Sequence, residues 1–355
     1  MSEITDRLPA AFLERLARVV PAEHLAAARA SFALDKPLCA RLNPLRAPGD
    51  EAYAALVSLG FSLVPLALAP DCFMIDVPPE RRREVTDAAV VRTGGAYLQN
   101  PSSLLPALAL APRGGEKVLD LCAAPGGKTL HLRALMARSG ETGGELAAVE
   151  AVRDRFFRLR AQLETFGASD VRTFLKDGRS VGYAVPEKFD RALVDAPCSS
   201  EARFDARDAT TFAHWSDAKI HAMAEKQRAL LRSAIDATRV GGTIVYSTCS
   251  LATEENEDIV AAVLAGLPEG AEVVTVPHGL DPAALPAHTS GVTPSGVHML
   301  RILPGPAWDA FFLVRLEKRS ATGTFPDSNR REERGSRADD ARRPKKPGAS
   351  GSRRR

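Results

Sequence analysis

The sequence has 355 residues, of which 45% are hydrophobic and 26% charged, a composition typical of a globular protein with one large and one smaller domain. No apolar run approaches the roughly 20 residues that span a bilayer, and residues 1–20 hold acidic side chains and no apolar signal-peptide core, so we expect a cytoplasmic protein with no membrane partner. The five cysteines lack close pairs and the histidines lack metal-ligand spacing, which argues against a disulfide framework and a metal site.

Residues 1–88 are predicted to form a small α+β domain. A helical stretch is followed by "CARLNPLR", which predicts a strand and a turn, then by the amphipathic helix pattern "DEAYAALVSLGF", then by "SLVPLALAPDCFMIDV", which predicts strands. Arginines in and just after this region either contact RNA phosphates or form a solvated basic face. They are Arg41, Arg46, Arg81, Arg82, Arg83 and Arg92.

Strand and helix patterns alternate across residues 89–318, the predicted main domain. The segments "KVLDLCA", "ELAAVE", "VRTFLKDG", "FDRALVDAP" and "GGTIVYSTC" predict strands, and helices are expected from Lys128, from Arg153 and over "KIHAMAEKQRALLRSAIDAT". Apolar residues of the last helix follow helical spacing with one polar gap at Gln227, and "AFFLVRL" predicts a closing strand. The alternation predicts an α/β domain built on a parallel sheet.

The glycine-rich turn "DLCAAPGGKT", residues 120–129, follows the first of these strands. A phosphate-binding loop would need a glycine where Cys122 stands, and Pro125 removes an N–H group from such a loop. The Gly-x-Gly-x-x-Gly pattern of dinucleotide-binding folds is absent. S-adenosylmethionine remains, because a glycine-rich turn and an acid about 20 residues downstream suit its carboxylate and ribose.

Acidic residues follow the next predicted strands. Glu150 closes "ELAAVE" at about the required distance, and Asp177 follows "TFLK", where a third strand would bring a carboxylate toward the adenine. Open α/β sheets bind ligands at the carboxyl ends of their strands. Together with the turn, these acids therefore predict an S-adenosylmethionine site.

Two cysteines stand at the ends of the last two predicted parallel strands, in "VDAPCSS" (residues 194–200) and "VYSTCS" (residues 245–250). Enzymes that methylate exocyclic amines have an aromatic residue where this chain has Cys198 after Asp195. Carbon 5 of a pyrimidine becomes nucleophilic only after a thiolate adds to carbon 6, and that chemistry requires a cysteine. The pattern predicts covalent methylation of a pyrimidine.

The local sequence leaves the ionisation of Cys249 open. Thr253 is a plausible helix N-cap, and a helix N-terminus near Cys249 would lower the thiol pKa. The acidic residues that follow, Glu254, Glu255 and Glu257, would raise it. The sign of the net shift does not follow from these residues.

Residues 319–355 are predicted to be a disordered basic tail. Between Ser320 and Arg355 there are 11 Lys or Arg against 5 Asp or Glu, so the net charge of +3 belongs to this end of the chain. The segment has almost no apolar residues with which to fold alone. It is either an electrostatic tether for RNA or a solvated end without a specific role.

Three motifs in the order "CAAPGGKT", "DAPCSS" and "STCS", with "FFLVRLEK" near the end, resemble the Sun/NOP (RsmB-like) family of S-adenosylmethionine-dependent RNA cytosine-5 methyltransferases. The resemblance runs from about Leu38 to Lys318. It implies a class I, Rossmann-like methyltransferase sheet with a closing antiparallel strand, an N-terminal domain that helps to hold RNA, S-adenosylmethionine as cofactor, and two active-site cysteines.

The resemblance also implies catalytic roles. Cys249, in the Thr-Cys motif, would be the nucleophile, Cys198 would assist product release, and Asp195 would hydrogen-bond the cytosine edge while lying beside the cofactor. DNA cytosine-5 enzymes attack from the Pro-Cys position instead. An exchange of roles between the two cysteines is therefore the main mechanistic alternative.

Cofactor roles follow from the same resemblance. Glu150, where the family commonly has Asp, would bind the ribose hydroxyls, Arg155 would contact the cofactor and Asp177 would lie beside the adenine. The cofactor turn would consist of Cys122, Ala123, Ala124, Pro125, Gly126, Gly127 and Lys128.

The predicted function is RNA methyltransferase, forming 5-methylcytosine through a covalent cysteine–cytosine intermediate, with ribosomal RNA as the expected acceptor and transfer RNA next. A non-catalytic RNA-binding ribosome assembly factor on the same scaffold is one alternative, and a methyltransferase acting on DNA or protein is another. The intact cysteines, Asp195 and glycine turn argue against the first, and the Thr-Cys arrangement argues against the second.

Overall fold

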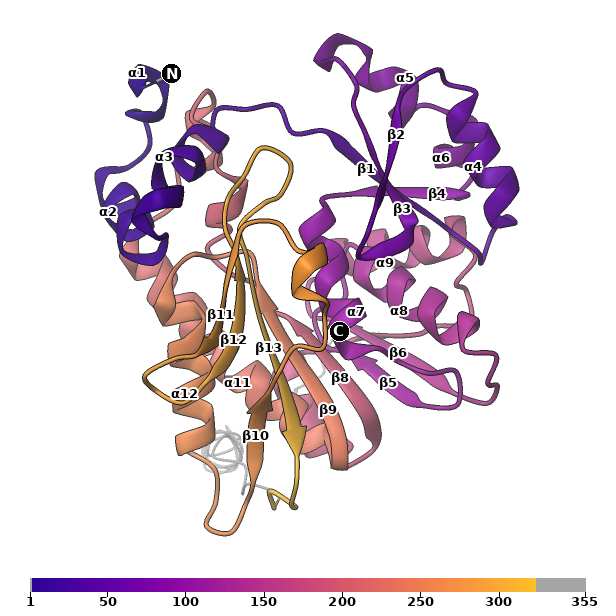
Figure 1. The fold of residues 1–355 in the computed structure, drawn as a ribbon. Helices are drawn as coiled ribbons and strands as arrows, with labels where there is room; N and C mark the ends of the chain where they lie inside the picture. The colour runs from indigo at the N-terminus through magenta and orange to yellow at the C-terminus, as the bar shows by residue number, and fades with distance from the viewer. Residues whose placement is uncertain (1, 324–355) are drawn as a thin grey trace, which may run out of the picture. The chain divides into compact units, whose positions relative to one another are not determined.

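The structure of this chain is a computed structural model that describes residues 2–323 (Figure 1). These residues form one contact unit that holds two β-sheets, one of four strands and one of nine. Of the predicted tail, residues 319–323 are described, and residues 324–355 lie outside the described part of the chain.

Twelve α-helices lie within the described residues, together with short 3-10 turns, and none of these helices is long and apolar enough to cross a membrane. The longest, α11, begins where the Ser216 hydroxyl accepts a hydrogen bond from the Lys219 N–H, a normal N-cap. The helices are α1 (Ser2–Thr5), α2 (Ala10–Val19), α3 (Ala22–Ser31), α4 (Gly49–Val57), α5 (Arg82–Thr86), α6 (Ala89–Arg92), α7 (Leu105–Leu110), α8 (Gly127–Arg138), α9 (Arg153–Thr165), α10 (Val181–Ala184), α11 (Asp217–Ala237) and α12 (Glu257–Ala265).

The smaller sheet is antiparallel, with strand order β2-β3-β1-β4. Helices α4 and α5 pack against one face of this sheet through an apolar cluster that includes Leu56, Phe73 and Val85. The division after residue 88 stays a prediction, but this sheet takes its last strand from beyond that residue. The strands are β1 (Leu38–Leu42), β2 (Leu63–Leu66), β3 (Ala69–Ile75) and β4 (Ala96–Gln99).

The larger sheet confirms the α/β fold class. Its order is β11-β12-β13-β9-β8-β5-β6-β7, with β10 paired to β13. Strands β5 to β9 pair in parallel, and β13 joins β9 antiparallel, as expected for the closing strand. The strands are β5 (Lys117–Asp120), β6 (Glu145–Glu150), β7 (Arg172–Leu175), β8 (Phe189–Asp195), β9 (Thr238–Thr248), β10 (Val273–Val276), β11 (His288–Val292), β12 (His298–Ile302) and β13 (Phe311–Lys318).

Helices cover both faces of the parallel strands (Figure 1). Neighbouring residues of β5 show the division, because Leu119 packs into the cluster that includes α11 and α12, whereas Val118 packs into the cluster that includes α7, α8 and α9. Strands buried on both faces are apolar at successive positions, which is why "KVLDL" and "RALVD" have continuous apolar runs.

One local prediction differs from the structure. Thr253 is not a helix N-cap: it begins a 3-10 turn over residues 253–255, and α12 starts at Glu257 after Asn256. The polar gap at Gln227 is also explained by the structure, because its side chain is fully buried and its amide donates hydrogen bonds to Pro197 O and Glu255. Both features lie next to the cysteine-bearing loops.

The strand order places the candidate site. From β5 the chain moves to β6 and β7 on one side and then to β8 and β9 on the other, so the order reverses between β5 and β8. Ligands bind outside the carboxyl ends of the strands at such a switch point. Asp120 ends β5, Asp195 ends β8, and Cys249 follows β9 at this edge.

Candidate active site

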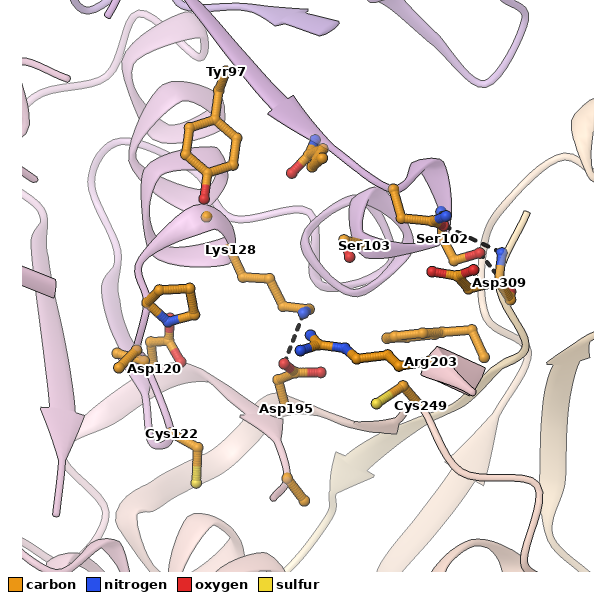
Figure 2. A pocket seen from close by; sticks show the side chains of 18 of the residues that line it. Tyr97, Ser102, Ser103, Asp120, Cys122, Lys128, Asp195, Arg203, Cys249 and Asp309 are labelled. Atoms are coloured by element: carbon orange, nitrogen blue, oxygen red, sulfur yellow. Dashed lines mark hydrogen bonds and ion pairs between the residues drawn. The ribbon is translucent and has the colours of Figure 1, made fainter. Parts of the chain in front are cut away.

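A cavity of about 510 Å³ lies at this edge of the sheet (Figure 2). Its walls come from the turn after β5, the ends of β8 and β9, the segment from β4 to α7, and the start of β13. Among the residues predicted for the site, those that line it are Cys122, Ala123, Ala124, Pro125, Gly127, Lys128, Asp195 and Cys249.

The glycine turn is shaped by two local requirements. Gly126 has a φ of 120°, which residues with a side chain rarely adopt. A Cβ on Gly127 would lie 2.7 Å from the hydroxyl of Tyr97, so glycine is needed for the close approach of β4. Behind the turn, the Thr129 hydroxyl donates a 2.7 Å hydrogen bond to Asp120 and fixes the start of α8 against β5.

Lys128 and Asp195 form an ion pair across the cavity. Figure 2 shows Lys128 reaching from α8 to Asp195, and its Nζ lies 2.7 Å from Oδ2. The Ser247 hydroxyl donates a 2.9 Å hydrogen bond to the other oxygen, Oδ1. Burial lowers the pKa of Lys128, but the charge and hydrogen bond of Asp195, together with the nearby Cys249 and Asp120, raise that pKa above its usual value, so Lys128 stays a cation. The aspartate is therefore fixed in orientation at the end of β8.

Two loops bring the predicted cysteines together: the Pro-Cys loop, residues 196–204, and the Thr-Cys loop, residues 249–256. The sulfurs of Cys198 and Cys249 lie 3.3 Å apart. Cys249 lines the cavity, whereas Cys198 is not among the residues that line it. The structure thus brings the two predicted cysteines together, with Cys249 at the cavity wall and Cys198 behind it.

The two thiols differ in pKa. A hydrogen bond from Cys198 lowers the pKa of Cys249, and the nearby charge of Arg203 lowers it further, against the effect of burial. The hydrogen bond to Cys249, burial and the charge of Glu255 together raise the pKa of Cys198 well above its usual value. Cys249 is therefore the sulfur that ionises first, which supplies the sign that the local sequence left open.

Glu150 and Arg155 lie behind the glycine turn. Arg155 Nη2 donates a 2.7 Å hydrogen bond to the carbonyl oxygen of Ala124 and lies 3.7 Å from Glu150 Oε2. Glu150 is buried at the end of β6, where Oε1 accepts the Val152 N–H at 2.9 Å. The structure thus brings the predicted ribose-binding acid next to the predicted cofactor turn.

Asp177 lies just beyond the carboxyl end of β7, as predicted. Its carboxylate accepts hydrogen bonds from the backbone N–H and guanidinium of Arg179, which lower the pKa of Asp177. Glu150, Arg155 and Asp177 are not among the residues that line the cavity. Their predicted contacts with a cofactor stay predictions.

Several lining residues were not predicted from the sequence, among them the polar side chains of Tyr97, Gln99, Asp120 and Arg203. Asp120 could have been found, because it ends a predicted strand as Asp195 does. Tyr97 and Gln99 belong to β4 of the smaller sheet, and Arg203 belongs to the Pro-Cys loop. Their place in the cavity depends on tertiary packing that no motif records.

The cavity walls fit a ligand with both donor and acceptor groups. Asp120 Oδ1 and Gln99 Nε2 are buried and lack a hydrogen-bond partner within residues 2–323. Burial raises the pKa of Asp120 to about 7. Buried polar atoms without partners are costly, so an acceptor and a donor left free here suit a bound polar molecule such as S-adenosylmethionine, which carries ammonium, carboxylate and hydroxyl groups.

Residues 107–317 match the family model described as 16S rRNA methyltransferase RsmB/F. The chain belongs to the RsmB/F family. This confirms the recognised resemblance and, since the methyltransferases of this family depend on S-adenosylmethionine, the predicted cofactor.

Curated members of the RsmB/F family align over most of the chain. Ribosomal RNA small subunit methyltransferase F of Cronobacter sakazakii is 34% identical over 325 residues, which cover 90% of this chain and 65% of that protein. The protein of the same description from Klebsiella pneumoniae is 34% identical over 332 residues, 92% of this chain and 67% of that protein. The chain thus spans about two thirds of the length of these relatives.

Solved structures agree with the RsmB/F assignment. A methyltransferase homolog protein from Pyrococcus horikoshii superposes with a TM-score of 0.69 and 26% identity, over 88% of this chain and 100% of that chain. The NSun6 structure from the same organism, solved with SFG, gives a TM-score of 0.71 at 18% identity, over 88% and 98%. The latter likeness supports the fold alone.

Proposed function

We propose that this chain is an S-adenosylmethionine-dependent RNA methyltransferase that forms 5-methylcytosine through a covalent adduct on Cys249. The observation that carries the proposal is the pair of sulfurs 3.3 Å apart beside Asp195, at the edge of a methyltransferase sheet. Exocyclic amine methylation needs no thiol, whereas carbon 5 of cytosine needs a nucleophile at carbon 6. A cysteine with a lowered pKa supplies it.

In the proposed reaction the Cys249 thiolate adds to carbon 6 of cytosine, forming a carbon–sulfur bond and making carbon 5 nucleophilic. Asp195, fixed by Lys128 and Ser247, hydrogen-bonds the cytosine edge and favours the activated ring. After methylation the carbon 5 proton passes to solvent water, and the electrons of that bond restore the carbon 5–carbon 6 double bond. The carbon–sulfur bond breaks at the same time, which returns the Cys249 thiolate. Cys198 lies beside the departing sulfur and is assigned to this release step.

S-adenosylmethionine, when bound, supplies the electrophilic methyl group. We assign the turn of residues 122–128 to its binding, with Glu150 on the ribose, Arg155 as a supporting contact and Asp177 beside the adenine. The support is the carboxyl-end position of each group and the free polar atoms of Asp120 and Gln99 in the cavity.

Ribosomal RNA is the proposed acceptor, with a cytoplasmic location to match. The support is the description of the RsmB/F family model and of the curated relatives as ribosomal RNA methyltransferases. Residues 1–88 are proposed to help hold this RNA. Attack by Cys198 instead of Cys249 is disfavoured by the pKa of Cys198, which lies well above its usual value.

The test is nucleoside mass spectrometry on unmodified total RNA, separated by size after incubation with the purified protein and labelled S-adenosylmethionine. The expected result is labelled 5-methylcytidine in the ribosomal fraction, and none with Cys249→Ala. Label in transfer RNA alone would replace the proposed acceptor. Absence of 5-methylcytidine from every fraction and from ribosomal assembly intermediates, with S-adenosylmethionine bound, would favour a non-catalytic RNA-binding factor.

A further inference from the structure

Two buried glutamates outside the cavity connect the Pro-Cys and Thr-Cys loops. Glu201 belongs to the Pro-Cys loop, yet its carboxylate packs against the Thr-Cys loop. There Oε2 accepts hydrogen bonds from the backbone N–H groups of Leu251 at 2.8 Å and Ala252 at 3.0 Å, and from the Ser250 hydroxyl at 3.0 Å. The loop that holds one cysteine is thus anchored on a side chain from the loop that holds the other.

Glu255 makes the reverse connection, from the Thr-Cys loop to the Pro-Cys loop. Its Oε2 accepts the backbone N–H of Ser199 at 2.9 Å and the Gln227 amide at 2.7 Å. Its Oε1 lies 3.0 Å from the hydroxyl oxygen of Ser250, whose single proton is shared between Glu255 and Glu201, and the Ser199 and Ser250 hydroxyls themselves lie 3.0 Å apart. Each loop therefore sends one carboxylate into the residues that directly follow the cysteine of the other.

Both carboxylates are buried away from solvent, at 0% exposure. Burying a carboxylate costs several kcal/mol unless hydrogen bonds and opposite charge offset the loss of water. For Glu201 the offset includes the Trp215 indole N–H at 2.9 Å and Arg15 Nε, from α2, at 3.7 Å. Hydrogen bonds that join buried groups in this way favour one arrangement of the two loops, even though Arg15 Nε and Gln227 Oε1 lack a hydrogen-bond partner among the described residues.

We propose that Glu201 and Glu255 are positioning residues that hold the sulfurs of Cys198 and Cys249 at the spacing required for attack and release. The inference deepens the proposed function and rests on it. Neither glutamate lines the cavity, so neither contacts cofactor or cytosine. Their contribution is to the rate of the chemical step and not to ligand affinity.

The expected fall in kcat can be judged from how strongly the rate of a covalent step depends on the position of the reacting groups. A displacement of about 1 Å in a reacting group costs on the order of 100-fold in rate. Loss of either carboxylate should therefore lower kcat by roughly 10- to 100-fold. Affinity for S-adenosylmethionine should change little, because the cofactor turn lies on a different loop.

Glu255→Gln is the most informative variant. Both oxygens of Glu255 face N–H or O–H donors, so a carboxamide must turn its own NH₂ group toward a donor. Glu255→Asp keeps the charge but shortens the side chain. Glu257→Gln is the matched control, because Glu257 begins α12 two residues later and pairs with Arg301 at 2.7 Å.

The variant Glu201→Gln tests the position of the sulfurs without changing the charged groups that shift the pKa of either cysteine. The charged groups that act on Cys249 are Arg203, Asp195 and Lys128, and Glu255 acts on Cys198. Replacement of Glu201 changes none of these groups.

Three quantities would be measured for each variant: kcat and KM on RNA, S-adenosylmethionine affinity by calorimetry, and the alkylation rate of each cysteine by peptide mass spectrometry. We expect kcat to fall 10- to 100-fold, cofactor affinity to stay within about twofold, and the alkylation preference for Cys249 over Cys198 to narrow. Cys39 and Cys72, buried in the smaller sheet, should remain protected.

Unchanged kcat and alkylation preference in Glu201→Gln and both Glu255 variants would overturn the proposal. The proposal would also be overturned if all three variants lost cofactor binding and exposed Cys39 and Cys72 to alkylation, since that pattern would show that the glutamates maintain the fold and not the spacing of the sulfurs. If Glu255→Gln does not fold, Glu255→Asp and Glu201→Gln decide the question. Should the wild-type protein methylate no RNA, the proposed function fails, while the alkylation comparison still tests the spacing of the sulfurs.

Discussion

At the residue scale, the candidate site depends on which of two adjacent thiols ionises. The hydrogen bond between the two thiols lowers the pKa of Cys249 and raises the pKa of Cys198, and nearby charges add to this difference: Arg203 lowers the pKa of Cys249 and Glu255 raises that of Cys198. Side chains that no motif names thus add to the difference in pKa between the two thiols. Of these two side chains, Arg203 is the simpler one to replace, because it is exposed and lines the cavity near Asp195 and Cys249 (Figure 2).

Arg203→Gln should slow alkylation of Cys249. The hydrogen bond from Cys198 and the charge of Arg203 both lower the Cys249 pKa, so removing the charge raises that pKa and leaves less thiolate at pH 7. A roughly two- to tenfold lower iodoacetamide rate at pH 7, converging on the wild-type rate at high pH and high salt, is expected. Arg207→Gln, which removes an arginine paired with Asp35 and Asp205, is the control. Equal rates at all pH values would contradict this account.

Asp120 gives a pH-dependent prediction for stability. Burial raises its pKa from 3.8 to about 7, so the folded protein holds a proton there that the unfolded chain has released. The bound proton contributes up to about 4 kcal/mol to the free energy of unfolding. This contribution is complete below about pH 4 and is lost as the pH rises to about 7. Asp120→Asn should therefore raise Tm more at pH 8 than at pH 5. Thermal unfolding of the cofactor-free protein, with exposed Asp50→Asn for comparison, measures this; a pH-independent difference would exclude it.

At the element scale, the parallel strands could be predicted because strands such as β5 and β8 are buried on both faces and have continuous apolar sequences. The strands β10, β11 and β12 were not predicted. Their sequences, "VVTV", "HTSGV" and "HMLRI", are partly exposed, and their place is fixed by pairing with β13 or with each other. Pairing of that kind depends on distant chain segments, which local patterns do not contain.

The same limit applies to the supports of the site. Gln227 lies on the apolar face of α11, and its partners come from the Pro-Cys and Thr-Cys loops. In the helical pattern, Gln227 interrupts the apolar positions, although its side chain is a buried hydrogen-bond donor. The motif residues of the site could be predicted, because reactive side chains follow directly after predicted strands. The buried polar residues behind them could not be predicted, because their partners come from distant parts of the chain.

Helix α2 is joined to both cysteine loops through Arg15. This largely buried guanidinium pairs with Glu201 at 3.7 Å and Asp217 at 3.3 Å, and also with Glu254. Arg15→Ala should destabilise the protein by about 1–3 kcal/mol, because Glu201 then keeps its hydrogen bonds but loses its cation.

Urea unfolding compares Arg15→Ala with Arg18→Ala, an exposed arginine on the same helix. Equal free energies of unfolding for the two variants would show that the contacts of Arg15 do not stabilise the packing of α2 against the two cysteine loops.

At the scale of the whole molecule, the basic charge lies in a part of the chain beyond the described residues. Residues 324–355 carry 11 Lys or Arg against 5 Asp or Glu. Residues 319–322 make hydrogen bonds with Glu272 and Asp236, so a truncation should keep Gly323. The tether hypothesis then predicts weaker RNA binding in the truncated protein, with a smaller salt dependence and unchanged turnover at saturating RNA.

Filter binding across a salt series, together with kcat on saturating RNA, tests the tether. A truncated protein with full affinity at all salt concentrations would favour the solvated-end interpretation. A loss of kcat would show that residues 324–355 act in catalysis, which the tether hypothesis does not allow.

The proposed reaction assigns the bond to cytosine to Cys249 and the release step to Cys198. The most direct measurement is peptide mapping of the RNA adduct formed by Cys198→Ala in the presence of S-adenosylmethionine and unmodified ribosomal RNA. The account predicts an adduct that survives denaturation, with the nucleotide attached to the peptide that contains Cys249, and no adduct in the double variant with Cys249→Ala. An adduct on any other residue, or its persistence without Cys249, would contradict the assignment.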